Sequence, residues 1–371
     1  MISKACLVGA YQKKLEELAR LPDMELDVLV PPYWRDSRGV TRLERRYAQG
    51  YKLYVVPMAL NGHFHLHWYP DLGARLRALR PDIVHIDEEP YNLATWQAMR
   101  LARALGASAC FFTWQNLPRA YPPPFRWFER YNYRHAAHAL AGSAAAAEVL
   151  RAKGYAGPLS VVPQFGVDPE EYRPGKAPRS PGVFVVGYAG GLVAEKGVDI
   201  LLKALAGLEG RWEARLVGEG AEGPRLARLT QRLGLAERVR FQGRVPSAAM
   251  PDFYRGLDVL VLPSRSRPNW VEQFGRVLIE AMACGVAVIG STCGEIPQVI
   301  GDAGLIFPEG DVEALRAQLA RLQADPLLRA ELAARGRARV LARYTQAQVA
   351  ADTYAAYRQM AGLGATKGAN L

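Results

Sequence analysis

The sequence predicts an α/β protein of two domains, each built from alternating strands and helices. Short apolar runs rich in Val, Ile and Leu recur along the chain, as in strands buried on both faces of a parallel sheet. Segments with helical periodicity separate these runs, and such alternation is typical of α/β folds. The length of 371 residues is too great for one ordinary core and suits two domains.

The predicted elements of the first half follow one another in this alternation. Strands are expected at residues 5–8, 26–30, 82–86, 108–113 and 159–162, and helices at residues 13–20 and 91–105. Residues 33–52 mix arginines and aromatics without periodicity, so they form either a long functional loop or a solvated surface segment. Residues 174–182, rich in Pro, Gly and charge, mark the boundary between domains expected at 1–172 and 181–345.

The second half repeats the pattern. Strands are expected at residues 183–188, 214–217, 239–242, 257–262 and 286–289, with a helix from Phe274 that ends at Gly285. A last helix, at about 346–362, precedes a tail expected to be frayed. The segment from Gly218 to Gly223 has the spacing G-x-G-x-x-G, but its place in mid-domain favours turn chemistry over dinucleotide binding.

Composition limits the classes of function. The net charge of +11 is compatible with nucleic acid, anionic lipid or phosphorylated ligands, yet no nucleic-acid motif is present. No apolar run has the length of a membrane helix, and charges come too early for a signal peptide. Cys6, Cys110, Cys284 and Cys293 lack metal or redox spacing, which indicates buried, reduced thiols. A cytoplasmic protein that binds no nucleic acid is expected.

The chemistry concentrates in residues 257–300. Gly275 opens the predicted helix without a side chain, so a phosphate could approach the N–H groups of the helix start. Glu272 and Glu280 flank this point, and carboxylates accept hydrogen bonds from sugar hydroxyls. A phosphate between two such groups predicts a nucleotide sugar. Glycoside hydrolysis is the rival use of two carboxylates, but eight helical residues would separate them by about 12 Å, which disfavours it without excluding it.

These residues carry a resemblance to a known family. The two glutamates eight residues apart, Phe274-Gly275 between them, the following EAMACG and the Gly294-Glu295 turn resemble the signature of glycosyltransferase family 4. The resemblance implies retaining enzymes of the GT-B fold, in which two Rossmann-like domains face a central cleft. It also implies that the last helix crosses back to the N-terminal domain, that the second domain holds the nucleotide sugar, and that the first holds the acceptor.

Further motifs extend the resemblance upstream. Residues 189–197, AGGLVAEKG, resemble the phosphate-binding loop of the family through Gly190, Gly191 and Lys196, although an arginine commonly stands where this chain has Gly191. The turn that contains Gly243, Arg244 and Val245 resembles the turn that contacts the nucleobase. With Phe274, Gly275, Arg276 and Glu280, these residues form the predicted binding site for the donor nucleotide and phosphates.

The reaction implied is transfer of a sugar, with retained anomeric configuration, from a nucleotide-diphosphate sugar to a glycan, lipid or small-molecule acceptor. Glu272 is expected to orient the donor sugar and Glu280 to bind the ribose. Lys196 and the N–H groups near Gly275 would stabilise the leaving diphosphate, which helps to take the proton of the acceptor. Gln115 stands where the family commonly has a histidine, and because Gln takes no proton only hydrogen bonding is expected there.

Four residues are candidates for the acceptor side. Gly9 lies in the first turn, and Glu88 and Glu89 follow a predicted strand at its carboxyl end, where they bind acceptor hydroxyls or complement a helix dipole. His63 alternates with His65 and His67, and on a strand the three would share one face and could bind metal.

Two further interpretations concern contact with a membrane and the class of protein. Residues 125–143 predict an aromatic, basic helix that either touches a lipid-linked acceptor, giving peripheral contact with the inner membrane face, or packs as an amphipathic helix. No metal and no cofactor is expected. A GT-B phosphorylase, a nucleotide-sugar epimerase-like enzyme and a non-catalytic sugar-nucleotide-binding subunit remain alternatives.

Overall fold

A computed structural model describes residues 1–36, 39–175 and 182–362. The chain divides into two compact units, which we call unit 1 (Met1–Gly166 with Gln346–Leu371) and unit 2 (Val167–Thr345). The predicted end of the first domain at residue 172 lies inside unit 2, because Val167 and Tyr172 are buried in the core of that unit. Of the predicted boundary segment, residues 176–181 lie outside the described residues, and so does the tail from residue 363.

Unit 1 is built on a parallel sheet. Strands β5 to β8 pair in sequence order, and β1 pairs with β4. Ile2 joins the two sets because it bridges Leu29 of β1 and Ile86 of β5 in parallel register. The strands are β1 (Asp27–Val30), β4 (Lys52–Val55), β5 (Ile83–Ile86), β6 (Ser108–Thr113), β7 (His138–Ala141) and β8 (Leu159–Val161).

The first strand is not where the sequence predicts it. Residues Ala5–Leu7 form a 3-10 turn, Gly9–Gln12 form another, and α1 (Lys13–Ala19) follows directly. The place in the sheet belongs to Ile2, whose N–H donates to the carbonyl of His85 at 2.8 Å, while the N–H of Ser3 donates to Leu29 at 3.0 Å. The prediction of a strand at 5–8 is wrong because the pairing is complete before Ala5.

Two other segments of unit 1 differ from expectation. Within the predicted loop 33–52, strands β2 (Tyr33–Asp36) and β3 (Gly39–Arg42) form an antiparallel pair. In the segment 125–143, helix α4 (Phe125–His135) ends and β7 begins three residues later. All four residues of β7 are buried, because the strand lies between β6 and β8. A buried central strand overrides the helical preference of an alanine-rich stretch.

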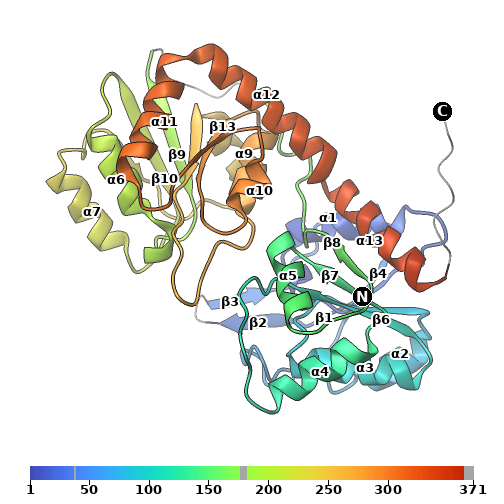
Figure 1. Cartoon of the computed structure of the whole chain (residues 1–371). Helices are drawn as coiled ribbons and strands as arrows, with labels where there is room; N and C mark the ends of the chain where they lie inside the picture. The colour runs from blue at the N-terminus through green and yellow to red at the C-terminus, as the bar shows by residue number, and fades with distance from the viewer. Residues whose placement is uncertain (37–38, 176–181, 363–371) are drawn as a thin grey trace. The chain divides into compact units, whose positions relative to one another are not determined.

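Helices cover both faces of the sheet of unit 1 (Figure 1). On one face α1 packs against α13 (Gln346–Met360), and the buried Nδ1 of His85 lies 2.5 Å from the hydroxyl of Tyr357 in α13. The last helix therefore belongs to unit 1, as expected. On the other face lie α2 (Leu72–Leu79), α3 (Leu93–Ala104) and α4. Helix α5 (Ala144–Ala152) packs against β7 and β8.

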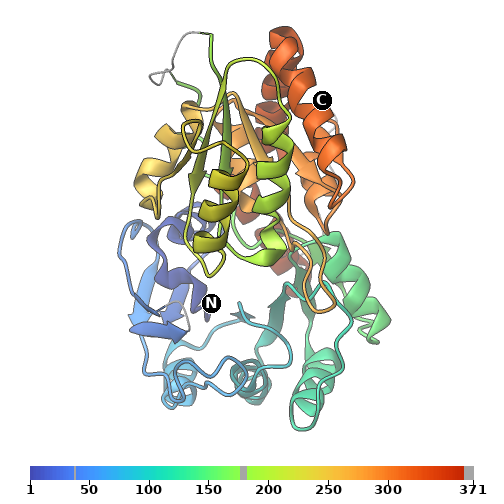
Figure 2. The same cartoon turned by 90° about the vertical axis from the view of Figure 1, so that its left-hand side faces the viewer.

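Unit 2 contains one parallel sheet of six strands in the order β11-β10-β9-β12-β13-β14. The strands are β9 (Phe184–Ala189), β10 (Trp212–Val217), β11 (Val239–Phe241), β12 (Val259–Leu262), β13 (Ala287–Ser291) and β14 (Leu305–Phe307). The helices are α6 (Val198–Ala206), α7 (Gly223–Arg232), α8 (Met250–Arg255), α9 (Arg276–Ala283), α10 (Ile296–Ile300), α11 (Val312–Ala324) and α12 (Pro326–Arg343). Helices α6 and α7 lie in front of this sheet in Figure 2, and α9 and α12 lie on its other face.

Each sheet has one point where the order of strands reverses. In unit 2 this point lies between β9 and β12, and in unit 1 it lies between Ile2 and β5. Such an order is that of a Rossmann-like fold, and open sheets of this kind bind ligands beyond the carboxyl ends of the strands at the switch point. The four cysteines are free and buried, as predicted. In the described part of the chain no helix is both long and apolar enough to cross a membrane.

Candidate functional site

The switch point of unit 2 brings together two of the residues that the sequence assigns to the donor. Lys196 lies in the loop after β9, and Glu272 lies in the loop after β12. The Nζ of Lys196 donates to Oε2 of Glu272 at 2.6 Å, and the hydroxyl of Ser264 donates to the same oxygen at 2.8 Å. Trp270 lies under the ammonium, with its ring centroid 5.0 Å from Nζ. A cation and a carboxylate therefore meet at one spot, partly accessible to solvent.

A tight turn fixes the backbone of Glu272. Gly294 has φ 57°, and a Cβ there would lie 2.2 Å from the carbonyl oxygen of Glu272. The N–H of Glu295 donates to that same carbonyl at 3.1 Å. The Gly294-Glu295 turn after β13 thus has a structural task, because only a glycine permits so close an approach.

Glycines also permit close packing of the loop after β9. Gly190 has φ 154°, and Gly218, after β10, has φ 133° with its missing Cβ 1.8 Å from the carbonyl oxygen of Gly190. The N–H of Leu192 donates to the carbonyl of Glu219 at 2.9 Å. The glycines of the Gly218–Gly223 segment therefore serve a tight turn, as the sequence predicts. Gly191 has only ordinary van der Waals neighbours.

The remaining donor candidates lie at the same edge of the sheet. Gly275 has φ 78° and is the N-cap of α9. Gly243, in the turn that continues to Arg244 and Val245 after β11, accepts a hydrogen bond from the N–H of Gly218 at 2.8 Å. Because all strands of this sheet are parallel, the loops that follow them leave the sheet at its carboxyl edge. These loops carry Gly190, Gly191, Lys196, Arg244, Val245, Glu272 and Gly275.

Glu280 lies one turn inside α9, where its side chain is buried. Its carboxylate accepts from the hydroxyl of Tyr254 and from Nε of Arg276, each at 2.7 Å. Burial and the charge of Glu280 raise the pKa of Tyr254 far above its usual value, so this phenol stays a donor. Phe274 packs edge-on against Tyr344 at 5.6 Å between ring centroids.

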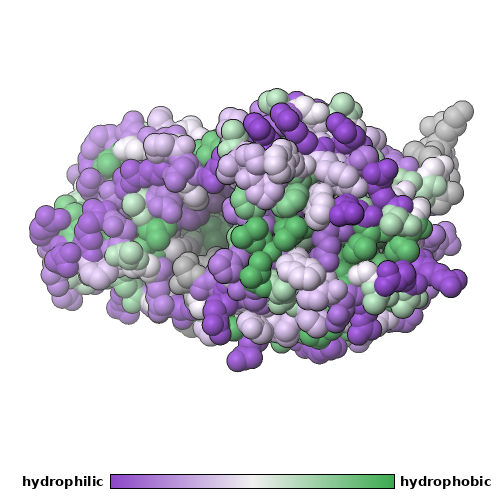
Figure 3. All heavy atoms as spheres, turned by 90° about the horizontal axis from the view of Figure 1, so that it is seen from below, coloured by the Kyte–Doolittle hydropathy of each residue, from purple (hydrophilic) through white to green (hydrophobic). Residues whose placement is uncertain are grey.

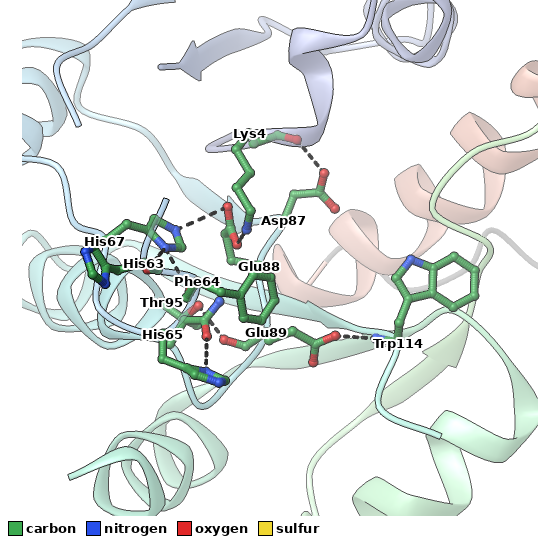
Figure 4. Close-up of polar contacts among 12 residues, drawn as sticks. Lys4, His63, Phe64, His65, His67, Asp87, Glu88, Glu89, Thr95 and Trp114 are labelled. Carbon is green, nitrogen blue, oxygen red and sulfur yellow. Dashed lines mark hydrogen bonds and ion pairs between the residues drawn. The ribbon is translucent and has the colours of Figure 1, made fainter. Parts of the chain in front are cut away.

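Unit 1 has a comparable arrangement at its switch point, drawn in Figure 4. Lys4, two residues after Ile2, forms an ion pair with Glu88, which follows β5. The Nε2 of the fully buried His67 lies 3.6 Å from the other oxygen of Glu88. Burial raises the pKa of Glu88, but the ammonium of Lys4 and the neighbouring ring of His67 outweigh it, and the pKa falls to about 2.

Glu89 points in a different direction from Glu88 and reaches the end of β6 (Figure 4). Its Oε2 accepts from the hydroxyl of Thr113 at 2.6 Å, and its Oε1 accepts from the N–H of Trp114 at 2.8 Å. Burial raises the pKa of Glu89 to about 7, although these two hydrogen bonds and Lys4 oppose the shift.

Gln115 is the next residue along this edge, and its side chain is buried. Its amide nitrogen donates to the carbonyl of Leu117 at 3.1 Å, and its amide oxygen accepts from Nζ of Lys153 at 3.2 Å. Lys153 also forms an ion pair with Glu129 of α4. Gln115 is therefore held as a hydrogen-bonding group within unit 1.

The other acceptor candidates are placed less favourably. The backbone N–H of Gly9 donates to the carboxylate of Glu44 at 2.8 Å. The three alternating histidines do not lie on a strand, so the condition for a shared face is not met: His63 is exposed, His65 is half-buried and His67 is fully buried. Among residues 1–36, 39–175 and 182–362, no group of three His, Cys, Asp or Glu side chains is arranged to hold a metal ion.

Sequence reasoning missed Lys4, Lys153 and Thr113, which contact the candidates Glu88, Gln115 and Glu89. Lys4 had a usable signal, because a polar residue just after the first strand lies at the carboxyl edge. The wrong position of that strand concealed it. Lys153 and Thr113 come from other elements, and no local pattern points to their partners.

Two family models match the chain, and together they span most of it. The model described as "Glycosyl transferase 4-like domain" matches residues 10–164, and "Glycosyl transferases group 1" matches residues 171–339.

Curated proteins match over shorter stretches. The D-inositol 3-phosphate glycosyltransferase of Streptomyces bingchenggensis is 34% identical over 201 residues, which are 48% of this chain and 43% of that protein. The GDP-mannose-dependent monoacylated alpha-(1-6)-phosphatidylinositol monomannoside mannosyltransferase of Corynebacterium glutamicum is 37% identical over 160 residues, 42% of this chain and 42% of that protein. This chain thus spans less than half the length of these two relatives.

Solved structures match over nearly the whole chain. Anabaena HepE in complex with UDP has a TM-score of 0.71 at 19% identity, covering 96% of this chain and 98% of that one. A glycosyltransferase from Rickettsia africae has a TM-score of 0.75 at 16% identity, covering 97% of both chains. At these identities the likeness establishes the fold, which is GT-B with two Rossmann-like domains. With both family models matched as well, the chain belongs to glycosyltransferase family 4.

Proposed function

We propose that this chain transfers a glycosyl group from a nucleotide-diphosphate sugar to a hydroxyl group of a glycan, lipid or small-molecule acceptor, with retention of the anomeric configuration. The observation that carries the proposal is the contact of Lys196 with Glu272 at the switch point of unit 2. A phosphate needs the cation and a sugar needs the hydrogen-bond acceptor, and both are supplied at one place.

Donor binding rearranges this pair. Lys196 contacts the diphosphate, and Glu272, still held by Ser264, accepts hydrogen bonds from the sugar. The N–H groups that follow Gly275 at the start of α9 add positive potential. Glu280 binds the ribose from its place between Tyr254 and Arg276, and the turn at Arg244 and Val245 contacts the base. Negative charge grows on the leaving diphosphate, so these fixed groups act most strongly in the transition state.

A screen of nucleotide sugars tests this function. The two curated relatives are named for GDP-mannose and for inositol phosphate substrates, so UDP-glucose, GDP-mannose and their N-acetylated counterparts form the donor panel, with inositol and inositol phosphates among the acceptors. A donor at 100 times its dissociation constant should stabilise the protein by about 2.7 kcal/mol. Wild-type protein should then release nucleoside diphosphate, and Glu272→Gln should release at least tenfold less. Binding without any turnover would instead indicate a non-catalytic subunit.

Two other enzyme classes share the fold and are separated by their products. A phosphorylase would need inorganic phosphate and would yield a sugar phosphate. An epimerase-like enzyme would release free sugar and nucleotide with no acceptor present. Neither has a specific contact in its favour, whereas the lysine and carboxylate at the switch point suit transfer.

We further propose that the protein is cytoplasmic and that unit 1 binds peripherally to the cytoplasmic face of the inner membrane. Helices α2, α3 and α4 lie side by side and contain seven arginines: Arg75, Arg77, Arg100, Arg103, Arg126, Arg130 and Arg134. All seven are exposed, and the one acidic residue of these helices, Glu129, is buried against Lys153. Trp127 exposes 60% of its surface among them. On this side of unit 1, apolar residues gather in a band among hydrophilic ones (Figure 3).

This basic, aromatic face suits an anionic lipid surface, because each arginine near such a surface contributes about 1 kcal/mol and tryptophan prefers the interface. Sedimentation with vesicles of phosphatidylglycerol and phosphatidylcholine tests it. Arg130→Glu with Arg134→Glu should weaken binding to the anionic vesicles at least tenfold. Arg228→Glu with Arg232→Glu, an exposed pair with the same spacing on α7 of unit 2, is the matched control and should bind as wild type. Equal binding by both variants would contradict the proposal.

A further inference from the structure

Two consecutive residues after β12 support the contact between Lys196 and Glu272. The hydroxyl of Ser264 donates to the carboxylate of Glu272 at 2.8 Å. Arg265, the next residue, contacts the 3-10 turn Ala194–Lys196, which carries the cation. The carboxylate is therefore held through its side chain, and the cation is held through the main chain that bears it.

Arg265 binds this turn through both its main chain and its side chain. Its backbone N–H donates to the carbonyl of Glu195 at 2.8 Å, and its Nε donates to the carbonyl of Ala194, also at 2.8 Å. These carbonyls belong to the two residues that precede Lys196, and both residues are half-buried. A shift of the turn relative to Arg265 would break hydrogen bonds that water replaces only in part.

The guanidinium of Arg265 is itself fixed by Asp199, in the first turn of α6. One of its terminal nitrogens lies 3.1 Å from Oδ1 of Asp199, and the other donates to Oδ2 at 3.4 Å. Such a two-point contact between a planar guanidinium and a carboxylate sets the orientation of both groups. Asp199 is buried and also lies 4.0 Å from Nζ of Lys203.

The chain on the other side of Lys196 is fixed as well. Gly197 has φ 64°, and a Cβ there would lie 2.0 Å from the carbonyl oxygen of Pro263. Only a glycine permits this approach. The backbone of Lys196 thus lies between a turn bound by Arg265 and a glycine packed on Pro263, while its side chain keeps 22% exposure.

A fixed main chain with a side chain that can turn suits the task proposed for Lys196. On donor binding its Nζ leaves Glu272 for the diphosphate, and the position of its Cα decides where the ammonium arrives. A displacement of about 1 Å in such a group can lower the rate by about 10². We propose that Arg265 is a positioning residue that places Lys196 for the leaving diphosphate, an inference that rests on the proposed function.

Arg265→Gln tests this role, because glutamine removes the guanidinium while Asp199 keeps Lys203 as a partner. The measurement is release of UDP or GDP from UDP-glucose or GDP-mannose. The value of kcat should fall about tenfold, with KM changed less than about twofold, because the ammonium acts most strongly in the transition state. Arg265→Lys keeps a cation beside Asp199 and should recover part of the lost rate.

Arg238→Gln is the matched control. Arg238 is half-buried in the same unit and donates to the carbonyls of Trp212 at 3.2 Å and Gly210 at 2.7 Å. It directly precedes β11, so it lies at the amino edge of the sheet and not at the edge of the Lys196 loop. Both variants should lower the urea midpoint to a similar extent, and only Arg265→Gln should lower kcat. Equal losses of kcat would overturn the inference.

A double-mutant cycle separates positioning from a general structural effect. Once Lys196→Ala has removed the ammonium, Arg265 has no group left to place. Adding Arg265→Gln to Lys196→Ala should then lower kcat by less than about twofold. A further loss of about tenfold would show that Arg265 acts independently of Lys196, and the inference would be wrong.

The outcomes separate this inference from the proposed function. If the wild-type protein turns over no nucleotide sugar, the proposed function fails and the inference fails with it. If the wild type is active but Arg265→Gln keeps its kcat, or changes KM alone, the proposed function stands and Arg265 is not a positioning residue. Should Arg265→Gln not fold, Asp199→Asn takes its place in the cycle. It loosens the guanidinium without removing it and should lower kcat in the same direction, and an unchanged kcat would count against the inference.

Discussion

Single contacts decide what the candidate residues can do. Lys196 and Glu272 were predicted separately, one for phosphate and one for sugar, and in the structure each is the partner of the other. A partly buried pair of this kind has little net effect on stability, because desolvation offsets the attraction. In the proposed function, Ser264 keeps Glu272 ordered before and after the donor arrives, whereas Lys196 turns from Glu272 to the diphosphate.

Replacement of Lys196 tests its role at this scale. Lys196→Ala should lower kcat by about 10² or more, as for the loss of an oxyanion donor, with a smaller rise in KM. Gly191, which has no side chain, cannot compensate. Lys203→Ala is the control, because Lys203 belongs to the same unit but is half exposed on α6. An increase confined to KM would mean that Lys196 binds the donor without stabilising its departure.

At the scale of elements, turns after parallel strands position the site. The loop that holds Glu272 gains its backbone geometry from the turn after β13, through Gly294 and Glu295. A motif residue without any reactive group thus acts through packing. The glycines of the loops after β9 and β10 act in the same way, since a side chain at Gly218 would overlap the carbonyl oxygen of Gly190.

Two glycine substitutions distinguish the cost of a left-handed backbone from the cost of a steric clash. Gly310 has φ 84° with no atom within 4 Å of an added Cβ, so Gly310→Ala should cost only the left-handed backbone penalty, about 1 kcal/mol. Gly294→Ala adds the clash with Glu272 and should cost roughly 3 kcal/mol. Urea unfolding measures both. Gly294→Ala should also weaken donor binding, and unchanged binding would show that the turn does not hold Glu272 in position.

At the scale of the whole chain, the last helix completes unit 1, far from that unit's other residues in sequence. Helix α13 packs on α1, and Tyr357 contacts the buried His85 of β5. Burial, together with Lys14 and the N-terminus, lowers the pKa of His85 well below 6.5. The folded protein keeps this imidazole neutral where the unfolded chain would bind a proton.

Acid should therefore destabilise the protein partly through His85. Because the folded pKa lies below the unfolded one, stability is full above the unfolded pKa and is lost as the pH falls below it. Between about pH 7.5 and about pH 5.5, the loss of unfolding free energy should be about 1.4 kcal/mol smaller in His85→Gln than in the wild type. Denaturant unfolding at both pH values measures this difference. An equal loss in both proteins would place the titration elsewhere.

The activity as a whole should need no divalent metal. Magnesium often offsets the charge of a nucleoside diphosphate, but here Lys196 and the start of α9 supply positive potential, and Glu272 and Glu280 are proposed to bind hydroxyl groups. Turnover should persist in excess EDTA. Complete loss, with rescue by magnesium or manganese, would contradict the proposal and make Glu195 or His63 with its neighbours the candidate ligands.

The sequence by itself determined the two-domain α/β class, nearly all strands of unit 2 and the family. These features depend on local periodicity and on motifs within short stretches, as in Glu272, Gly275 and Glu280. Only the tertiary structure decided which groups meet. Lys196 reaches Glu272 across 76 residues and Lys4 reaches Glu88 across 84, because switch-point loops belong to strands far apart in the chain. The first strand and the raised pKa of Glu89 likewise depend on neighbours from other elements, and no local pattern records such neighbours.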